Sequence, residues 1–301
     1  MQISTNSYFR QNTESFQDLK TQAAKLQEQI STGKKISAAS DDPVSFSDLA
    51  LLKARDVRLA QYKRNIDVAR QTLTLEDSAL TQASNLLTRL KELSISGSND
   101  TLSPADRKLV AIEAKGVTDS LLDLANTKDA NGLPIFGGFK SGNPFQRQVD
   151  GTIIYLGDSN KTQQAVGDDA QVTVGFSGHE VFNRVPMGQN IPSKSVFEIV
   201  SAISDSLAAG KTPLTPNDDI SKALDHVISQ QAEVGSRLSL LDNAEKKLQD
   251  NQTATTAQIS VLQDTNIEKA VTDLQKKLTT LEAAQTSFVK IAQLSLFNYL
   301  R

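Results

Sequence analysis

The sequence predicts a mainly α fold: an elongated helical rod or coiled coil of the N- and C-terminal segments, with a small β-rich outer domain inserted between them. Three observations predict it. Apolar residues recur at spacings of three, four and seven at both ends of the chain, as in helices that bury one narrow stripe. Alanine, leucine, glutamine, threonine and serine dominate outside the middle, which suits long helices. Glycine, proline and short β-prone runs gather in residues 133–192.

The two terminal stripes are the candidate assembly interface. An isolated helix leaves such a stripe in water, so each stripe needs a partner surface. The spacing fits either the private core of a monomeric bundle or a seam between copies. The length of the terminal segments favours the seam, because they have little globular mass to pack on. The candidate interface residues are Phe9, Phe16, Leu19, Leu26, Ile30, Ile267, Val271, Leu274, Leu278, Leu281, Phe288, Leu296 and Phe297.

The first helix is predicted over residues 4–32, with Gly33 as its C-terminal cap. Asp42-Pro43 then marks a helix start, because the carboxylate can cap the free amides and proline suits the first helical position. This second helix is expected to stop near Gly97. Its apolar stripe comprises Leu59, Ile66, Ala69, Leu73, Leu80, Ala83, Leu87 and Leu90.

Ser103-Pro104 repeats the start signal, with Asp106 at the capping-box position. The third helix is expected to end by Asn131-Gly132. The character of the chain then changes to a β-rich insert, in which Asp150-Gly151 is a hairpin signal. The β-prone runs are residues 151–155, 170–176 and 179–182.

Helical spacing resumes at Val196 and ends at Gly210, and Thr215-Pro216 starts a helix that continues almost to Arg301. A break is expected at residues 264–266, where Asp, Thr and Asn cluster, because all three are poor helix formers. The predicted domains are residues 1–42 as an N-terminal coiled-coil segment and connector, 43–132 and 193–262 as two parts of a helical rod, 133–192 as the outer domain, and 263–301 as a C-terminal coiled-coil segment.

Composition and charge argue against several functional classes. The formal net charge of −3 is too small to indicate a nucleic-acid partner. The absence of cysteine excludes disulfides, thiolate metal sites and a cysteine nucleophile. No stretch reaches the roughly 18 apolar residues of a membrane span, so no membrane partner is expected. The first ten residues lack the apolar run of a signal peptide, so export would use another route.

Catalytic and metal-binding patterns are not expected either. His179 and His226 have no second histidine or carboxylate at ligand spacing, and His226 is expected on a helix surface. The glycine pairs and Gly-Asp pairs of the insert lack the phosphate-loop, dinucleotide and calcium-loop patterns, and turn chemistry explains them better. Asp41-Asp42 is interpreted as a helix cap and not as an acid–base pair. The sequence therefore predicts no enzyme, no cofactor and no metal site.

The segment Gln29-Ile-Ser-Thr-Gly-Lys-Lys-Ile36, followed by Ser40-Asp-Asp-Pro43, resembles the N-terminal signature of the bacterial flagellin family. The Asp-Asp-Pro version is similar to the hook-associated junction proteins within it. Leu124-Ala-Asn-Thr-Lys-Asp-Ala-Asn-Gly132 with Ile135-Phe-Gly-Gly138 resembles the stretch where that family leaves its helical domain for its outer β domain. The tail from Glu268 to Leu300 resembles the family's C-terminal helix. Leu133-Pro134 departs from the pattern, because proline cannot donate to a strand partner.

The resemblance implies an extracellular structural role in the bacterial flagellum, serving motility. The terminal helices would pair and pack against those of neighbouring copies in a homo-oligomeric ring. That ring would join hook-associated protein 1 to flagellin. The chain would be exported unfolded through the flagellar type III route, after an export chaperone has bound its C-terminal region. A lone copy would then leave Phe9, Leu26, Leu278 and Phe288 without partners.

Two alternatives compete with the junction role. One is flagellin itself, the filament subunit, which shares the terminal design. The other is an enzyme or a carbohydrate-binding module in residues 133–192, which the sequence disfavours because it offers no paired catalytic carboxylates or metal ligands.

Overall fold

The computed structural model describes residues 2–212 and 216–299, and side chains for these except residues 2–6, 8, 216, 217 and 292–299. The chain forms two compact units. The terminal unit comprises Met1–Arg58 and Asn251–Arg301, and the central unit is Leu59–Asp250. Two long helices, α2 (Pro43–Gly97) and α6 (Pro216–Gln263), contribute to both units. The finer division into five segments made from the sequence stays a prediction.

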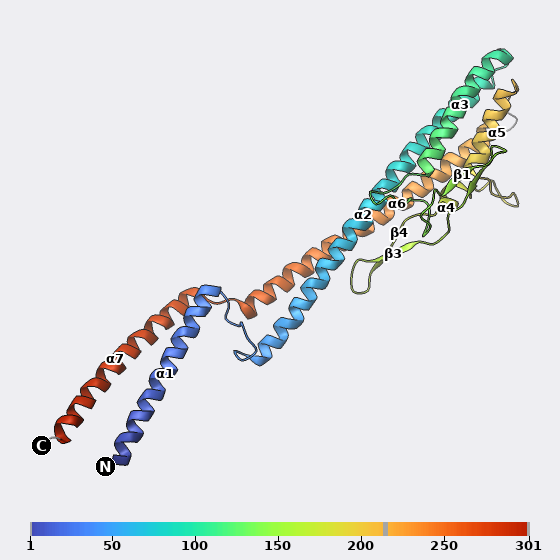
Figure 1. Cartoon of the computed structure of the whole chain (residues 1–301). Helices are drawn as coiled ribbons and strands as arrows, with labels where there is room; N and C mark the ends of the chain where they lie inside the picture. The colour runs from blue at the N-terminus through green and yellow to red at the C-terminus, as the bar shows by residue number, and fades with distance from the viewer. Residues whose placement is uncertain (1, 213–215, 300–301) are drawn as a thin grey trace. The chain divides into compact units, whose positions relative to one another are not determined.

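In the terminal unit, α1 (Gln2–Thr32) lies beside α7 (Ile267–Tyr299), as the blue and red helices of Figure 1 show. Gly33 follows α1 with a φ of +70°, the left-handed conformation in which glycine ends helices without strain. This confirms the predicted cap at Gly33.

The breaks after α1 and after α6 lie side by side in the terminal unit. The Lys35 N–H donates to the Gln263 carbonyl at 2.6 Å, and the Thr265 N–H donates to the Gly33 carbonyl at 2.9 Å. Helix α6 ends at Gln263, and α7 begins at Ile267. The predicted break at residues 264–266 is therefore confirmed, and its freed backbone groups pair with the connector that follows α1.

The start of α2 is confirmed in detail. The Asp42 carboxylate accepts hydrogen bonds from the Val44 and Ser45 N–H groups, both at 3.1 Å, and from the Ser45 hydroxyl at 2.6 Å. These bonds satisfy amides that have no partner within the helix. They also lower the pKa of Asp42, with the Ser45 hydroxyl contributing most.

In the central unit, the apolar stripe predicted for the second helix is buried. The core also takes in the facing residues of α6, such as Val227, Val234 and Leu241. Helix α3 (Pro104–Ala125) packs against α5 (Val196–Ala208), as Figure 1 shows. Both have capping boxes, the first formed by Ser103 with Asp106. Stripes of apolar residues on four helix segments thus close one core.

The end of α3 differs from the prediction. The helix stops at Ala125 and does not continue to Asn131-Gly132. The reason is tertiary: the Asn126 side chain accepts from the Phe145 N–H at 2.9 Å and donates to the Phe145 carbonyl at 3.0 Å. Asn126 therefore holds β1 (Phe145–Arg147) at the end of the helix.

Pro134 is tolerated because of its position in a short antiparallel bridge with Lys128. The hydrogen bonds of this bridge join Asp129 N–H to the Leu133 carbonyl and Ile135 N–H to the Thr127 carbonyl. The pair of Lys128 and Pro134 lies between these bonds, where no N–H is needed.

The insert contains two small antiparallel sheets within the described residues. In the first, β1 pairs with β2 (Ile153–Tyr155), with Gln146 opposite Ile154. The turn between them uses Gly151 at a φ of +90°, which confirms the hairpin signal. In the second, β3 (Thr162–Ala165) pairs with β4 (Gln171–Val174).

The prediction of a β-prone run at residues 179–182 was wrong, because α4 (Gly178–Phe182) is a short helix. Ser177 caps it by accepting from the Glu180 N–H, and the helix turns Val181 and Phe182 into the core. Val181 and Phe182 are adjacent in the sequence and both are buried. A helical turn can direct both side chains toward the core, whereas a strand would point them to opposite faces. A cluster of buried aromatic rings surrounds the helix: Phe136, Phe145, Phe182 and Phe197.

Candidate assembly surfaces

The α1–α7 pair brings most of the predicted interface residues together within one chain. The ring of Phe288 meets the rings of Phe9 and Phe16 edge to face, with centroids 5.1 and 5.6 Å apart. The expectation that Phe9 and Phe288 lack partners in a lone copy was therefore wrong. The physical reason is that the two stripes belong to one chain and can bury one edge of each against the other.

The pair does not cover the two stripes completely. Half-buried members are Phe9, Phe16, Leu19, Leu26, Ile30, Leu274, Leu281 and Phe288. On α7, however, Ile267, Val271 and Leu278 remain 51%, 38% and 49% exposed. Val289 and Ile291 are exposed as well, although the sequence analysis did not single them out. Leu296 and Phe297 lie outside the residues whose side chains are described. Ile267, Val271, Leu278 and Val289 share one side of the helix, whereas Ile291 points to another, so one apolar face of α7 stays open to a further partner.

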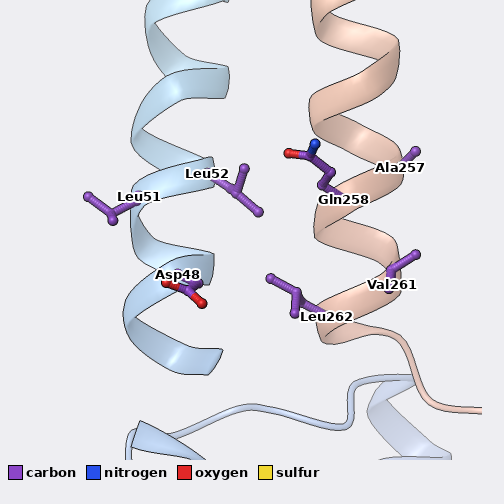
Figure 2. Close-up of a pocket in the computed structure, with 7 residues that line it drawn as sticks. All are labelled: Asp48, Leu51, Leu52, Ala257, Gln258, Val261 and Leu262. Atoms are coloured by element: carbon purple, nitrogen blue, oxygen red, sulfur yellow. The ribbon is translucent and has the colours of Figure 1, made fainter. Parts of the chain in front are cut away.

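A second apolar surface lies between the first turns of α2 and the last turns of α6. It is a groove of about 570 Å³ lined by Asp48, Leu51, Leu52, Ala257, Gln258, Val261 and Leu262. Figure 2 shows Leu52 and Leu262 pointing toward the facing helix, and Leu51 and Val261 pointing away from it. Leu51 and Val261 are 69% and 82% exposed.

Sequence reasoning missed most of this groove. None of Leu51, Leu52 and Val261 was among the residues predicted to form an apolar stripe. The signal that could have found them is the pair of adjacent apolar residues, Leu51-Leu52 and Val261-Leu262. Neighbours on a helix point about 100° apart, so one member of each pair can face the other helix only if the second faces elsewhere.

An ion pair holds the base of α1 against the connector. The Lys25 ammonium lies 2.8 Å from the Asp41 carboxylate, which also accepts from the Ser37 and Ala38 N–H groups at 3.0 Å each. The hydrogen bond from Lys25, followed by those from Ser37 and Ala38, holds the pKa of Asp41 well below its usual range. Asp41 therefore orients the connector, while its neighbour Asp42 caps α2.

The two histidines have separate surroundings. His179 is exposed, whereas His226 is half-buried and its Nε2 lies 2.8 Å from the Glu180 carbonyl oxygen. His226 lies on helix α6, as expected, but its ring also contacts the inserted region. Within residues 2–212 and 216–299, no group of three His, Asp or Glu side chains could hold a metal ion.

The Gly157-Asp158 turn of the insert serves the fold. Asp158 accepts hydrogen bonds from the Phe139 and Asn160 N–H groups at 3.1 and 2.9 Å. The Asn160 bond contributes most to lowering the pKa of Asp158. The carboxylate therefore closes a turn, as the interpretation by turn chemistry requires.

Known proteins resemble the chain at both ends. The model of the bacterial flagellin N-terminal helical region matches residues 3–141, and that of the C-terminal helical region matches residues 218–300. The chain belongs to the flagellin family. The two matched regions contain all of α2, α3 and α7, and α1 except for its first residue, so they include nearly the whole α1–α7 pair.

Within this family the chain is similar to flagellar hook-associated protein 3 along its whole length. That protein from Escherichia coli K12 is 28% identical over 99% of this chain and 99% of its own length, and the Salmonella typhimurium LT2 protein shows the same values. A flagellin of Listeria monocytogenes is 23% identical over 97% of this chain and 92% of its own length. The chain is a structural flagellar protein of the hook-associated type, which confirms the resemblance in its sequence.

Solved structures show the same fold. Flagellar hook-associated protein 3 from Legionella pneumophila superposes with a TM-score of 0.66 at 24% identity, over 71% of this chain and 98% of that one. A putative flagellar hook-associated protein from Vibrio parahaemolyticus gives 0.64 at 21% identity, over 74% and 99%. The predicted fold class, mainly α with an inserted β-containing region, is confirmed. No helix in the described part of the chain has the length and apolarity that a bilayer span requires.

Proposed function

We propose that this chain is the adaptor that joins the flagellar hook to the flagellin filament, as a homo-oligomeric ring next to hook-associated protein 1. The observation that carries the proposal is the full-length similarity to hook-associated protein 3, which covers both terminal helices and the insert. The protein acts by assembly and not by catalysis.

The open face of α7 supports assembly on physical grounds. Burying one large apolar side chain contributes about 1.5–3 kcal/mol. On this face, much of that contribution is not gained in the single chain, because four apolar side chains stay exposed: Ile267, Val271, Leu278 and Val289. A neighbouring copy that covers them would gain it, and the loss of conformational freedom would be shared over a long contact. We therefore assign the predicted stripe residues to an interface between copies. The α1–α7 pair covers one edge of this interface within each chain, and a neighbouring copy would cover the rest.

The groove at Leu51 and Val261 gives a second contact of the same kind. It belongs to the terminal unit, as α1 and α7 do. We propose that flagellin or hook-associated protein 1 completes the remaining contacts, and that an export chaperone covers the open face of α7 beforehand.

A deletion strain tests the role directly. Cells lacking this chain should build hooks without filaments and release flagellin into the medium, and expression of the intact chain should restore motility. Filaments of normal length on the deletion strain would refute the junction role.

Flagellin is the second candidate, favoured by the 23% identity to the Listeria monocytogenes protein over nearly the whole chain. Seeded polymerisation separates the two. Purified flagellin extends long filaments from seeds, whereas a junction protein should add a limited layer and stop. Long homopolymers of this chain would support the flagellin alternative.

The surface contacts can be tested by a charge placed on the open face. Leu278→Asp and Val261→Lys should reduce incorporation into flagella without changing the helical content, since both side chains are largely exposed. Thr279→Asp and Thr256→Lys make the same charge changes at exposed positions of the same helices and serve as matched controls. Equal incorporation of the apolar-site variants and their controls would show that these faces are not interfaces.

A further inference from the structure

A glutamate occupies a core position of α2. Glu76 lies between Leu73 and Leu80 in the apolar stripe, at the three–four spacing that the surrounding core residues follow, and it is completely buried. Carboxylates are rarely fully buried without a charged or hydrogen-bonded partner, because desolvation disfavours the ionised form. The sequence analysis passed over this position, although a charged residue inside an apolar stripe is a readable signal.

The two carboxyl oxygens of Glu76 have different surroundings. Oε1 accepts a hydrogen bond from the Phe176 N–H at 2.9 Å. Oε2 is buried and has no hydrogen-bond partner among the described residues. An ionised carboxylate would leave an unsatisfied negative charge at Oε2, whereas the protonated acid avoids it.

Arg237 of α6 closes the other side of the same segment. Its guanidinium lies 4.0 Å from the centroid of the Phe176 ring and donates to the Gly175 carbonyl at 3.2 Å. It also donates to the Thr173 carbonyl at 3.4 Å and to Glu233 at 2.5 Å. Residues 173–176, at and just after the end of β4, are thus bonded to α2 through Glu76 and to α6 through Arg237.

We propose that Glu76 and Arg237 form a proton-dependent clamp that holds the end of β4, and with it the inserted β region, against the helices of the central unit. With Glu76 protonated the clamp is closed. Loss of the proton places a charge in the core and favours local release of residues 173–176. The proposal concerns the central unit alone and does not depend on the junction role.

The charged groups around Glu76 are consistent with a clamp that is closed when Glu76 is protonated. From α6 the group faces Arg237, which is itself paired with Glu233. From the insert, Lys161 lies 5.8 Å from the Phe176 ring centroid and pairs with Glu180. Burial raises the pKa of Glu76 to about 8, against the opposing effects of the Phe176 N–H and of Arg237.

The sign of the pH dependence follows from comparing the closed and open forms. In the open form Glu76 meets water and loses its proton near its ordinary pKa of 4.5, whereas the closed form keeps the proton until about pH 8. Between these values the open form binds fewer protons, so opening becomes easier as pH rises, by up to about tenfold per pH unit. Above about pH 8 the effect levels off.

Hydrogen exchange at the Phe176 amide tests the clamp in the full-length chain. After correction for the intrinsic pH dependence of exchange, protection should fall by about tenfold per unit between pH 6 and 8. Glu76→Gln keeps the shape of the side chain without the charge and should remove this dependence. Glu92→Gln changes an exposed glutamate on the same helix and should keep it. Equal pH dependence in wild type and Glu76→Gln would overturn the proposal.

A second measurement holds even if Glu76→Gln fails to fold. Carbon-13 NMR of the Glu76 carboxyl in the wild-type chain should show a midpoint well above that of an ordinary glutamate. The Arg237→Met change should raise the midpoint further, since it removes a nearby positive charge. A midpoint near 4.5, or one that Arg237→Met leaves unchanged, would contradict the clamp.

Discussion

The Phe288 ring of α7 lies edge to face against the Phe16 ring of α1, with 5.6 Å between centroids and 89° between the ring planes. Phe9 meets the same ring at 5.1 Å and 87°. Phe9 and Phe16 are two helical turns apart on one face of α1, so a single aromatic side chain of α7 spans both. This contact ties the chain's two ends together and leaves the neighbouring face of α7, with Val271 and Leu278, exposed.

Phe288→Asp should separate α1 from α7. The substitution removes both aromatic contacts and places a charge in a half-buried site, with an expected loss of about 1.5–3 kcal/mol from that pair. Incorporation into flagella, measured by labelling of isolated hooks, should fall sharply while the central unit keeps its circular dichroism. Gln285→Asp, on an exposed position of α7, is the control. Unchanged incorporation of Phe288→Asp would argue against a role for this contact in assembly.

Pro43→Gly should lower thermal stability by weakening the start of α2. Proline fixes the first helical φ, and glycine is among the poorest helix formers, so a loss of about 1 kcal/mol is expected. Pro192→Gly is the control, because Pro192 lies in an exposed loop. It raises the conformational entropy of the unfolded chain to the same degree but does not alter a helix start. Circular dichroism melts of the two variants should differ; identical melting temperatures would show that Pro43 has no special effect.

Strong acidification should loosen the connector, at a pH below the range in which ordinary aspartates take up a proton. Because the folded-state pKa of Asp41 is lowered, its contribution is present above the usual aspartate range and is lost as pH falls through the folded value. The amide signals of Ser37 and Ala38 should then shift as their bonds to Asp41 break. Asp41→Asn should reproduce that shift at neutral pH, whereas Asp18→Asn on α1 should not. If the Ser37 and Ala38 amide signals do not shift in Asp41→Asn, Asp41 does not orient the connector.

Phe182→Ala should destabilise the inserted β region strongly. Phe182 is fully buried and its ring contacts those of Phe136, Phe145 and Phe197. Truncation of a buried phenylalanine costs about 3–5 kcal/mol. Denaturant unfolding followed through the aromatic signals should show this loss. Phe139→Ala is the matched control, because Phe139 is 66% exposed; a similar loss in both variants would contradict the aromatic core.

The sequence was most informative where local chemistry decides the backbone. The helix ends and starts predicted from local signals are confirmed, because caps and breakers act through neighbouring atoms. They are those at Gly33, Asp42-Pro43, Ser103-Pro104 and Asp264-Thr265-Asn266. The stripe of α2 was equally readable, since burial repeats with the helical period.

Sequence reasoning failed where a distant residue decides the outcome. Helix α3 ends at Ala125 because Asn126 binds β1, nineteen positions away. His226 is half-buried because its ring meets Glu180. Neither partner can be read from spacing along the chain.

By itself, the sequence determined the mainly helical fold, the starts of α2 and α3, the break between α6 and α7, the flagellin-family membership and the apolar stripes at both ends. Only the tertiary structure decided which edges of those stripes close on each other, where the Leu51–Val261 groove lies, and that Glu76 faces Phe176 and Arg237. The reason is physical. Helical period and capping depend on residues within a few positions, whereas burial and pKa depend on whatever the fold brings near.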